Sequence, residues 1–458
     1  MLWATTLIAG TLVLLPQPAA RPAPAPVDPR ITWLRDHAIS VRTIDEPALD
    51  QPEDFSDLEP LRAMIGSARV VGLGEQSHGD GATFKAKCRL VRFLHQQMGF
   101  DVLAWESGLF DCRRVDELFA AGVAPADAAT IAEQHGVFGI WAQSAQAKPV
   151  LEYAARTQKT DRRLIMAGFD NQYTSSASRR QHASWLDSFF TRLADRGCKL
   201  PEPVVSSGVD AVRWMAARLR ETGAAPRGDP DRLAESRAAV RALITLIEDQ
   251  RAYLARHEEP REIEFARLTL LNLLTFDRAS RETDRQNISN TPREVLQLRD
   301  QRMGENLVFL AREYFKGKRL IVWAASSHLL RNGGECTSLY GPENRGGDFK
   351  PLGHFAAEGL GRDYFVITFS AHQGAIGRPW SAPTPIARSE PGDLEALMAD
   401  AGLSLAIVPL NPAADDPEAA WLREPQVMRP MGYGRERAVW GRCFDALFFT
   451  RDMTPSTR

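Results

Sequence analysis

The sequence predicts an α/β fold, in which a mostly parallel central sheet is flanked by helices and interrupted by a long all-helical insert. The first observation is a set of short apolar runs, which are typical of buried strands. The second is that stretches with helical spacing of apolar residues separate these runs. The third is that residues from about 178 to 315 show only the helical pattern. The runs are Val70–Leu73, Val102–Trp105, Leu164–Phe169, Leu320–Ala324, Tyr364–Phe369, Leu403–Val408 and Ala446–Thr450.

The first of these runs ends in a polar loop, Gly74–Gly79. Apolar residues then recur at helical spacing until Gly99, which ends the predicted helix. The next run closes at Glu106, so this part is predicted to be a strand–helix–strand unit with a right-handed crossover. Further helices are predicted at Arg113–Ala121 and Trp141–Thr157, before the third strand.

The helical insert contains two predicted helix starts. Asp229 precedes Pro230, as an N-cap before a proline at the first helical position. Thr291-Pro292-Arg293-Glu294 has the pattern of a capping box. The predicted division of the chain is a signal peptide at 1–20, a Pro/Ala spacer and helical lead-in at 21–69, an α/β catalytic domain in two parts at 70–177 and 317–458, and the insert at 178–316.

Composition gives no argument for a nucleic-acid or anionic-membrane partner, because 56 Lys and Arg residues balance 58 Asp and Glu residues. The apolar stretch Leu2–Leu15, followed by a Pro/Ala tract, resembles a signal peptide and is short for a membrane span. We therefore expect a periplasmic or secreted protein with no stable membrane span after cleavage. An uncleaved anchor and a misassigned start are the alternatives.

The five cysteines form no C-x-x-C pair, which makes a zinc cage an unlikely use of them. Most of them are expected to be small buried residues. One disulfide, for example between Cys88 and Cys112, is compatible with an oxidising compartment, but sequence spacing alone does not establish a pair.

Ionisable side chains follow four successive apolar runs. Glu75 and His78 follow the first, Glu106 the second, Asp170 the third and His328 the fourth. Because parallel strands end at one edge of a sheet, we expect these side chains to converge there. Histidine with carboxylates suits general acid–base chemistry on water, since a carboxylate fixes the imidazole tautomer and raises its basicity. Each residue also has a simpler structural interpretation, such as a helix cap or a turn.

Three further residues are predicted to bind substrate. Lys87 lies on the helix after the first loop, where it could stabilise a developing negative charge. Asp170 and His354 are the other candidates, although Asp170 would equally well hold its own turn. The long loops Gly333–Gly353 and Gly374–Pro385 are expected to carry specificity.

Several well-known catalytic motifs are absent from the sequence: G-x-S-x-G, the P-loop, G-x-G-x-x-G and H-E-x-x-H. The Glu/His set leaves two chemistries open. One is activation of water by a base with no cofactor or metal. The other is a divalent metal held by Glu75, His78, Glu106 and His328.

A series of short motifs extends from about Val70 to the C-terminus. They are G-L-G-E-Q-S-H-G, A-W-E-S-G at 104–108, A-G-F-D at 167–170, R-D-Q-R-M-G-E-N-L at 299–307, I-V-W-A-A-S-S-H-L at 321–329, L-G at 352–353 and F-D-A-L-F-F at 444–449. In this order and spacing they resemble the erythromycin esterase family. The resemblance implies a two-part α/β fold with a helical insert and a deep cleft. It also implies hydrolysis of a macrolide-type lactone by activated water, with no covalent serine intermediate.

By this resemblance His78 matches the general base, Glu75 and Glu106 match acidic site residues, and His328 matches the second histidine of the family's W-A-H-N-x-H segment. The chain departs from the pattern at Ala325 and Ser326, which replace the first histidine and the asparagine of that segment. Lys87 stands where macrolide enzymes often have arginine, and the two cations differ in hydrogen-bonding geometry.

We therefore expect an exported carboxylic ester hydrolase that acts on a small-molecule ester or lactone. A macrolide substrate, and with it a role in antibiotic resistance, is one option among several. The alternatives are a metal-dependent hydrolase and a non-catalytic binding protein, the latter favoured by Ala325.

Overall fold

The computed structural model describes residues 28–47, 52–173, 175–219, 229–284, 286, 290–339, 349–412 and 415–458. Its centre is a nine-stranded sheet in the order β1-β9-β12-β7-β2-β5-β3-β4, with β8 paired to β7. The strands from β12 to β4 in this order are parallel, whereas β1, β8 and β9 pair in antiparallel fashion. These strands are β1 (Ile39–Ser40), β2 (Val70–Glu75), β3 (Val102–Gly108), β4 (Ile165–Asp170), β5 (Leu320–Ala325), β7 (Tyr364–Ile376), β8 (Thr384–Ile386), β9 (Leu405–Pro409) and β12 (Ala446–Met453). The predicted fold class is confirmed.

The two faces of the sheet carry separate hydrophobic cores, because successive strand residues point to opposite sides. In β5, Val322 packs into one core and Trp323 into the other. Helices cover both faces, so the central strands are buried throughout. The helices before the insert are α1 (Pro29–His37), α2 (Glu59–Ile65), α3 (Gly81–Met98), α4 (Leu109–Ala120), α5 (Ala128–His135), α6 (Gly139–Ala142) and α7 (Lys148–Thr157). Those after β5 are α14 (Ser326–Leu329), α15 (Leu352–Leu360), α16 (Leu394–Asp400) and α17 (Trp440–Cys443).

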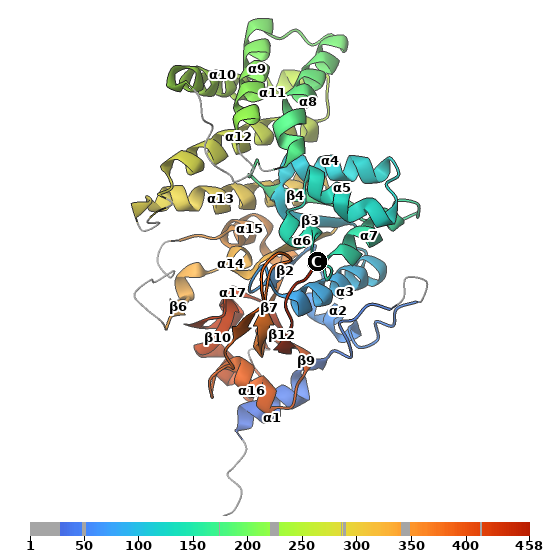
Figure 1. The fold of residues 1–458 in the computed structure, drawn as a ribbon, viewed down its shortest axis with the longest axis vertical. Coiled ribbons are helices and arrows are strands. Elements are labelled where there is room, and N and C mark those ends of the chain that lie inside the picture. The colour runs from blue at the N-terminus through green and yellow to red at the C-terminus, as the bar shows by residue number, and fades with distance from the viewer. Residues whose placement is uncertain are drawn as a thin grey trace, which may run out of the picture.

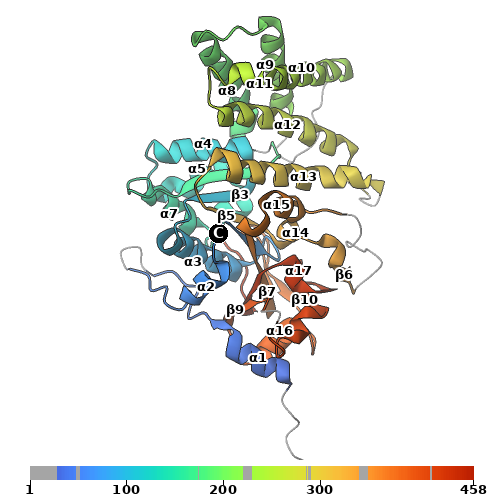
Figure 2. The same cartoon turned by 180° about the vertical axis from the view of Figure 1, so that it is seen from behind.

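In its described residues, the segment between β4 and β5 contains helices joined by turns and loops, and no strand. It consists of α8 (Ser176–Asp195), α9 (Glu202–Arg218), α10 (Pro230–Asp249), α11 (Arg251–Leu254), α12 (Pro260–Glu282), α13 (Arg293–Phe309) and a π-helical turn at Leu310–Tyr314. Helices α8 to α12 share a third core and form a layer at one end of the molecule, opposite α1 and α16 (Figures 1 and 2). Helix α13 lies next to α15 and links this layer to the sheet.

Several local predictions need correction. The helix predicted at Trp141–Thr157 is two helices, α6 and α7, separated by a turn. Asp229 does cap α10, but Thr291 does not cap α13, because its hydroxyl accepts the Asp284 N–H instead. The loop predicted at Gly374–Pro385 is shorter, because β7 continues to Ile376 and β8 begins at Thr384, so that residues 377–383 are the loop of a hairpin. The sequence also did not predict the second sheet, formed by β6 (Thr337–Ser338), β10 (Gln426–Met431) and β11 (Gly434–Ala438).

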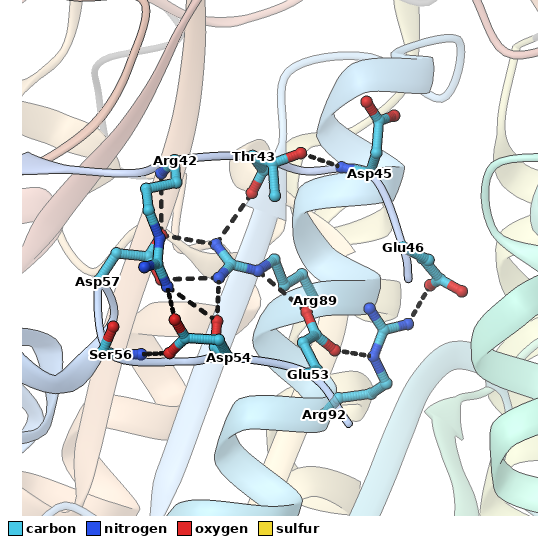
Figure 3. Close-up of polar contacts among 10 residues, drawn as sticks. All are labelled: Arg42, Thr43, Asp45, Glu46, Glu53, Asp54, Ser56, Asp57, Arg89 and Arg92. Carbon is cyan, nitrogen blue, oxygen red and sulfur yellow. Dashed lines mark hydrogen bonds and ion pairs between the residues drawn. The ribbon is translucent and has the colours of Figure 1, made fainter. Parts of the chain in front are cut away.

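Among the described residues of the lead-in, only α1 and α2 are helical. Between them runs an acidic segment, here residues 41–47 and 52–57, which is held on α3 by arginine side chains (Figure 3). All five N–H groups of Arg89 are used, since it donates to Thr43, Glu53, Asp54 and twice to Asp57. Arg92 pairs with Glu46 and Glu53 beside it.

The arginines of this ion cluster shift the pKa of a carboxyl group. Burial disfavours the charged form of Asp57, yet hydrogen bonds from Arg89 and Arg42 outweigh it and lower the pKa to about 2. The acidic segment is therefore attached to α3 by ion pairs, and Asp57 stays ionised because the arginines bond to it.

Replacing Arg89 by methionine should lower the free energy of unfolding by about 3–5 kcal/mol, because the buried Asp57 and Glu53 would lose the cation that they share and keep only Arg42 and Arg92 as partners. The matched control is Lys85→Ala, which removes an exposed pair with Asp45 and should cost at most about 1 kcal/mol. Urea unfolding midpoints of both variants measure this, and equal shifts would contradict it.

Candidate active site

The candidate site lies where β2, β5, β3 and β4 end side by side, as the positions of the polar residues predicted. Glu75 ends β2, Glu106 lies near the end of β3, and Asp170 ends β4. Helix α14, which carries His328, begins directly after β5. Gly74 allows α14 to approach β2, because a Cβ at that position would lie 2.6 Å from the Ser326 hydroxyl.

Glu75 is fully buried and is the centre of the first half of the site. His78 Nδ1 donates to its Oε1 over 3.1 Å, and Trp141 Nε1 donates to the same oxygen over 3.0 Å. The Trp141 ring also meets the His78 ring edge-on, with centroids 5.5 Å apart. Asp80 stabilises the loop that joins Glu75 to His78, because its carboxylate accepts the Ser77 N–H over 2.9 Å. The imidazole is thus held from two sides.

Lys87 contacts Glu75 from the interior. Its ammonium pairs with Glu75 Oε2, donates to the Ala324 carbonyl over 3.2 Å and lies 4.6 Å from the Trp323 ring centroid. The side chain is completely buried, so it has no exposed surface with which to contact a substrate. The prediction that Lys87 binds substrate is therefore not supported by its position, which is that of a residue that orients Glu75.

Glu106 is the centre of the second half of the site. Its Oε2 accepts the backbone N–H of Ala325 over 2.9 Å. Its Oε1 accepts from Arg299 Nη2 over 2.9 Å and lies 3.3 Å from His328 Nε2. Ala325 therefore still binds Glu106 through its main chain, although its side chain is only a methyl group.

Arg299, on α13, joins the strand ends to His328. It donates to both oxygens of Asp170, over 3.2 and 2.7 Å, and its Nη1 lies 3.2 Å from His328 Nε2. Asp170 was predicted to bind substrate, but the structure places it as the buried partner of this arginine.

Asp300, the next residue of α13, accepts from His328 Nδ1 over 2.6 Å and from the Leu352 N–H over 3.0 Å. The second contact attaches α15 to the site. Gly353 makes this packing possible, because a Cβ there would lie 2.1 Å from the Leu329 carbonyl oxygen.

His354, the remaining predicted substrate contact, points elsewhere. Its Nε2 lies 3.1 Å from Glu358 on the same helix, and no recorded contact joins it to the other site residues described. Sequence reasoning had not selected Arg299, Asp300 or Trp141 as site residues. Arg299 and Asp300 do begin one of the motifs that carry the family resemblance, whereas Trp141 had only been placed in a helix.

The electrostatics distinguish the two histidines. Burial lowers the pKa of His78 below its usual 6.5; Glu106 opposes this, and His328, Arg299 and Arg378 reinforce it. Burial would also lower the pKa of His328, but Asp300 and Glu106 together raise it above the usual value. Burial opposes ionisation of Glu106 too, yet His328, Arg299 and His78 lower its pKa to about 2.

His78 Nδ1 bonds to Glu75, whose other oxygen pairs with Lys87. Burial lowers the pKa of Lys87 well below its usual value. Because burial also lowers the pKa of His78, the imidazole is neutral near pH 7, and its Nδ1 proton faces Glu75. Its Nε2 remains a proton acceptor on a side chain that is 28% exposed, and no described residue bonds to it.

The part of the chain that the structure describes offers neither a group of metal ligands nor a membrane-spanning helix. Within the described ranges, no three His, Cys, Asp or Glu side chains are grouped in a way that could hold a metal ion. No helix in the same ranges is both long and apolar enough to cross a bilayer. The expected signal peptide lies outside the residues that the structure describes.

The sequence profile of erythromycin esterases matches residues 95–453. The chain belongs to the erythromycin esterase family. A putative hydrolase of Bacillus subtilis, YbfO, is 21% identical over 93% of this chain and 91% of its own length. Erythromycin esterase type II of Escherichia coli is 38% identical over 77 residues, which are 17% of each chain.

Solved structures agree with this fold. A mutant of the erythromycin esterase EreC in its open conformation has a TM-score of 0.67 at 16% identity, covering 89% of this chain and 96% of that one. A succinoglycan biosynthesis protein has a TM-score of 0.70 at 18% identity, covering 93% and 97%. These similarities concern the fold, and the family membership supports a hydrolase.

Replacing Asp300 by asparagine should lower the pKa of His328 below that of the unmodified protein, because the desolvation that remains is no longer offset by the Asp300 charge. The titration of the His328 ring protons by NMR measures the shift. Glu358→Gln, beside His354, is the control and should leave His328 unchanged. An unaltered His328 titration in the Asp300 variant would contradict the assignment.

Proposed function

We propose that this protein hydrolyses an ester or lactone by general-base activation of water, with His78 as the base. The observation that carries the proposal is the hydrogen bond from His78 Nδ1 to Glu75, which leaves Nε2 to accept a proton from water. The water oxygen would then attack the carbonyl carbon. The proton held on Nε2 would pass to the leaving alkoxide as the carbon–oxygen bond breaks.

The second half of the site supports stabilisation of the oxyanion. Arg299 is cationic, and His328 gains positive charge easily because its pKa is raised. A fixed positive charge next to a developing negative oxygen lowers the barrier to attack on a carbonyl. Glu106 and Asp170 would hold the Arg299 guanidinium in position.

The substrate proposal is broader than a macrolide. A hollow of about 720 Å³, lined by Phe138, Ser175 and Arg180 among others, is within the usual size range of small-molecule sites. His78 does not line it, but Phe138 stacks on Trp141, with ring centroids 6.0 Å apart, and Trp141 contacts His78. Ala325, where the family pattern has histidine, leaves more room beside Glu106 and supports a different or wider range of esters.

The β7–β8 hairpin is proposed to contribute to specificity. Gly377 donates its N–H to the Gly79 carbonyl over 3.1 Å, which places the hairpin tip next to the His78 loop. Trp380 in this tip is 50% exposed, and Arg378 is close enough to affect the His78 pKa. An apolar surface beside a cation suits a substrate that has both an apolar and a polar part.

We also propose that the protein acts outside the cytoplasm, in the periplasm or secreted, on the grounds of its N-terminal apolar core and Pro/Ala tract. We propose that it needs no cofactor. Loss of hydrolysis after treatment with a chelator, with recovery on adding zinc or manganese, would favour the metal-dependent alternative instead.

His78→Ala should reduce kcat/KM for ester or lactone hydrolysis by about 10²–10⁴-fold, the usual contribution of a general base. A panel of p-nitrophenyl esters, simple lactones and a macrolide lactone would identify a substrate. His257→Ala, in the helical layer, is the matched control and should retain full activity. Equal rates for wild type and the His78 variant on every cleaved substrate would refute the proposal.

The pH profile of kcat/KM should have two limbs. The acidic limb should lie below pH 6.5, because His78 must be neutral to act and burial lowers its pKa. The basic limb should lie above pH 6.5, because the pKa of His328 is raised and the limb marks the loss of its proton. Asp300→Asn should move that limb to lower pH, since Asp300 contributes to the raised pKa. An acidic limb above pH 6.5 would contradict the assignment of His78 as the base.

A further inference from the structure

Two of the five cysteines meet in the core. The Sγ atoms of Cys336 and Cys443 lie 4.0 Å apart, although the residues are 107 positions apart in the sequence. Cys336 lies between α14 and β6, and Cys443 ends α17. Both side chains are buried, so solvent does not separate the sulfur atoms.

The two segments that carry these cysteines are also hydrogen-bonded to each other. Arg331 donates its N–H to the Cys443 carbonyl over 3.2 Å, and the Asn332 side chain donates to the Arg442 carbonyl over 2.7 Å. Arg442 returns an ion pair to Glu335 over 3.1 Å. These contacts hold the backbone before Cys336 against the end of α17 before any bond forms. To form a disulfide, the sulfur atoms approach from 4.0 Å to a bond length of about 2 Å.

We propose that Cys336 and Cys443 form a disulfide in the mature protein. The remaining cysteines lack this arrangement, since Cys88 Sγ contacts the carbonyls of Gln146 and Ala147 and not another sulfur. The pair that sequence spacing had suggested as an example, Cys88 with Cys112, is therefore not the one that the fold brings together. The inference does not depend on the reaction assigned to His78.

The bond forms by thiol–disulfide exchange with an external disulfide, either a small molecule or a protein. One cysteine thiolate attacks that disulfide and releases one reduced thiol. The second thiolate then attacks the mixed disulfide and releases the other, so the two cysteines lose two electrons and two protons. The neighbouring Cys443 and burial raise the pKa of Cys336, so exchange is faster while the chain folds than after the core has closed.

The bond would connect the segment that follows the site to the C-terminal part of the sheet. A short segment that includes Arg331 and Asn332 joins His328 to Cys336. Asp445 lies between Cys443 and the start of β12. Cross-linking across such a long stretch of chain restricts the unfolded state strongly. The expected effect is therefore on the stability of the fold and on the placement of α14.

Thiol counting tests the proposal. The full chain is folded with a mixture of reduced and oxidised glutathione, denatured, alkylated and weighed by mass spectrometry. Wild type should show three alkylated cysteines and one cross-linked peptide pair containing Cys336 and Cys443. Cys336→Ala and Cys443→Ala should each show four, whereas the control Cys88→Ala should show two. Five alkylated cysteines in wild type, or a cross-link between other positions, would overturn the proposal.

A second measurement has its main readout in the wild-type protein. A reductant should lower the melting temperature of the oxidised wild-type protein by on the order of 5 °C, as expected for loss of a long-range cross-link. The same reductant should leave the melting temperature of Cys443→Ala unchanged. An equal response of both proteins would show that no such bond contributes to stability and would refute the inference.

Discussion

The structure of the site depends on one buried carboxylate. Glu75 ends a strand that is covered on both faces, where an unpaired charge would be unstable. Lys87 supplies the compensating group from α3, while His78 and Trp141 use the other oxygen. Lys87 is equally buried. If either side chain moved away, the other would be left in an apolar environment without its partner. This requirement fixes the position of α3 against β2 and the orientation of the proposed base.

The two halves of the site differ in how they are assembled. Glu75, His78 and Lys87 are close in the sequence and are brought together by a single strand–loop–helix unit. The other half combines Glu106, Asp170, Arg299 and His328 from separate elements, and Arg299 contacts all three of the others. Replacement of the expected histidine by Ala325 falls in this second half, where the main chain still binds Glu106. The first half, with Glu75 and His78, does not include this replacement.

Two peripheral segments are also held by a few buried contacts with parts of the chain that are distant in the sequence. The acidic segment is held on α3 by Arg89 and Arg92, on the helix that also presents Lys87. The segment after His328 is held against α17 by Arg331 and by the contact of Cys336 with Cys443. The first attachment is thus on the helix that carries Lys87, and the second is on the segment that follows α14, which carries His328.

By itself, the sequence determined the α/β class, the principal strands of the central sheet and the convergence of Glu75, Glu106 and Asp170 at one edge. Strand periodicity and the rule that parallel strands end together are local properties that need no tertiary information. Only the tertiary structure decided that Lys87 is buried, that Asp170 binds Arg299 and that His354 points away. It also decided that Cys336, not Cys88 or Cys112, has a sulfur neighbour. The physical reason is that side-chain burial and pairing depend on which distant segments pack together, and residue spacing does not encode that.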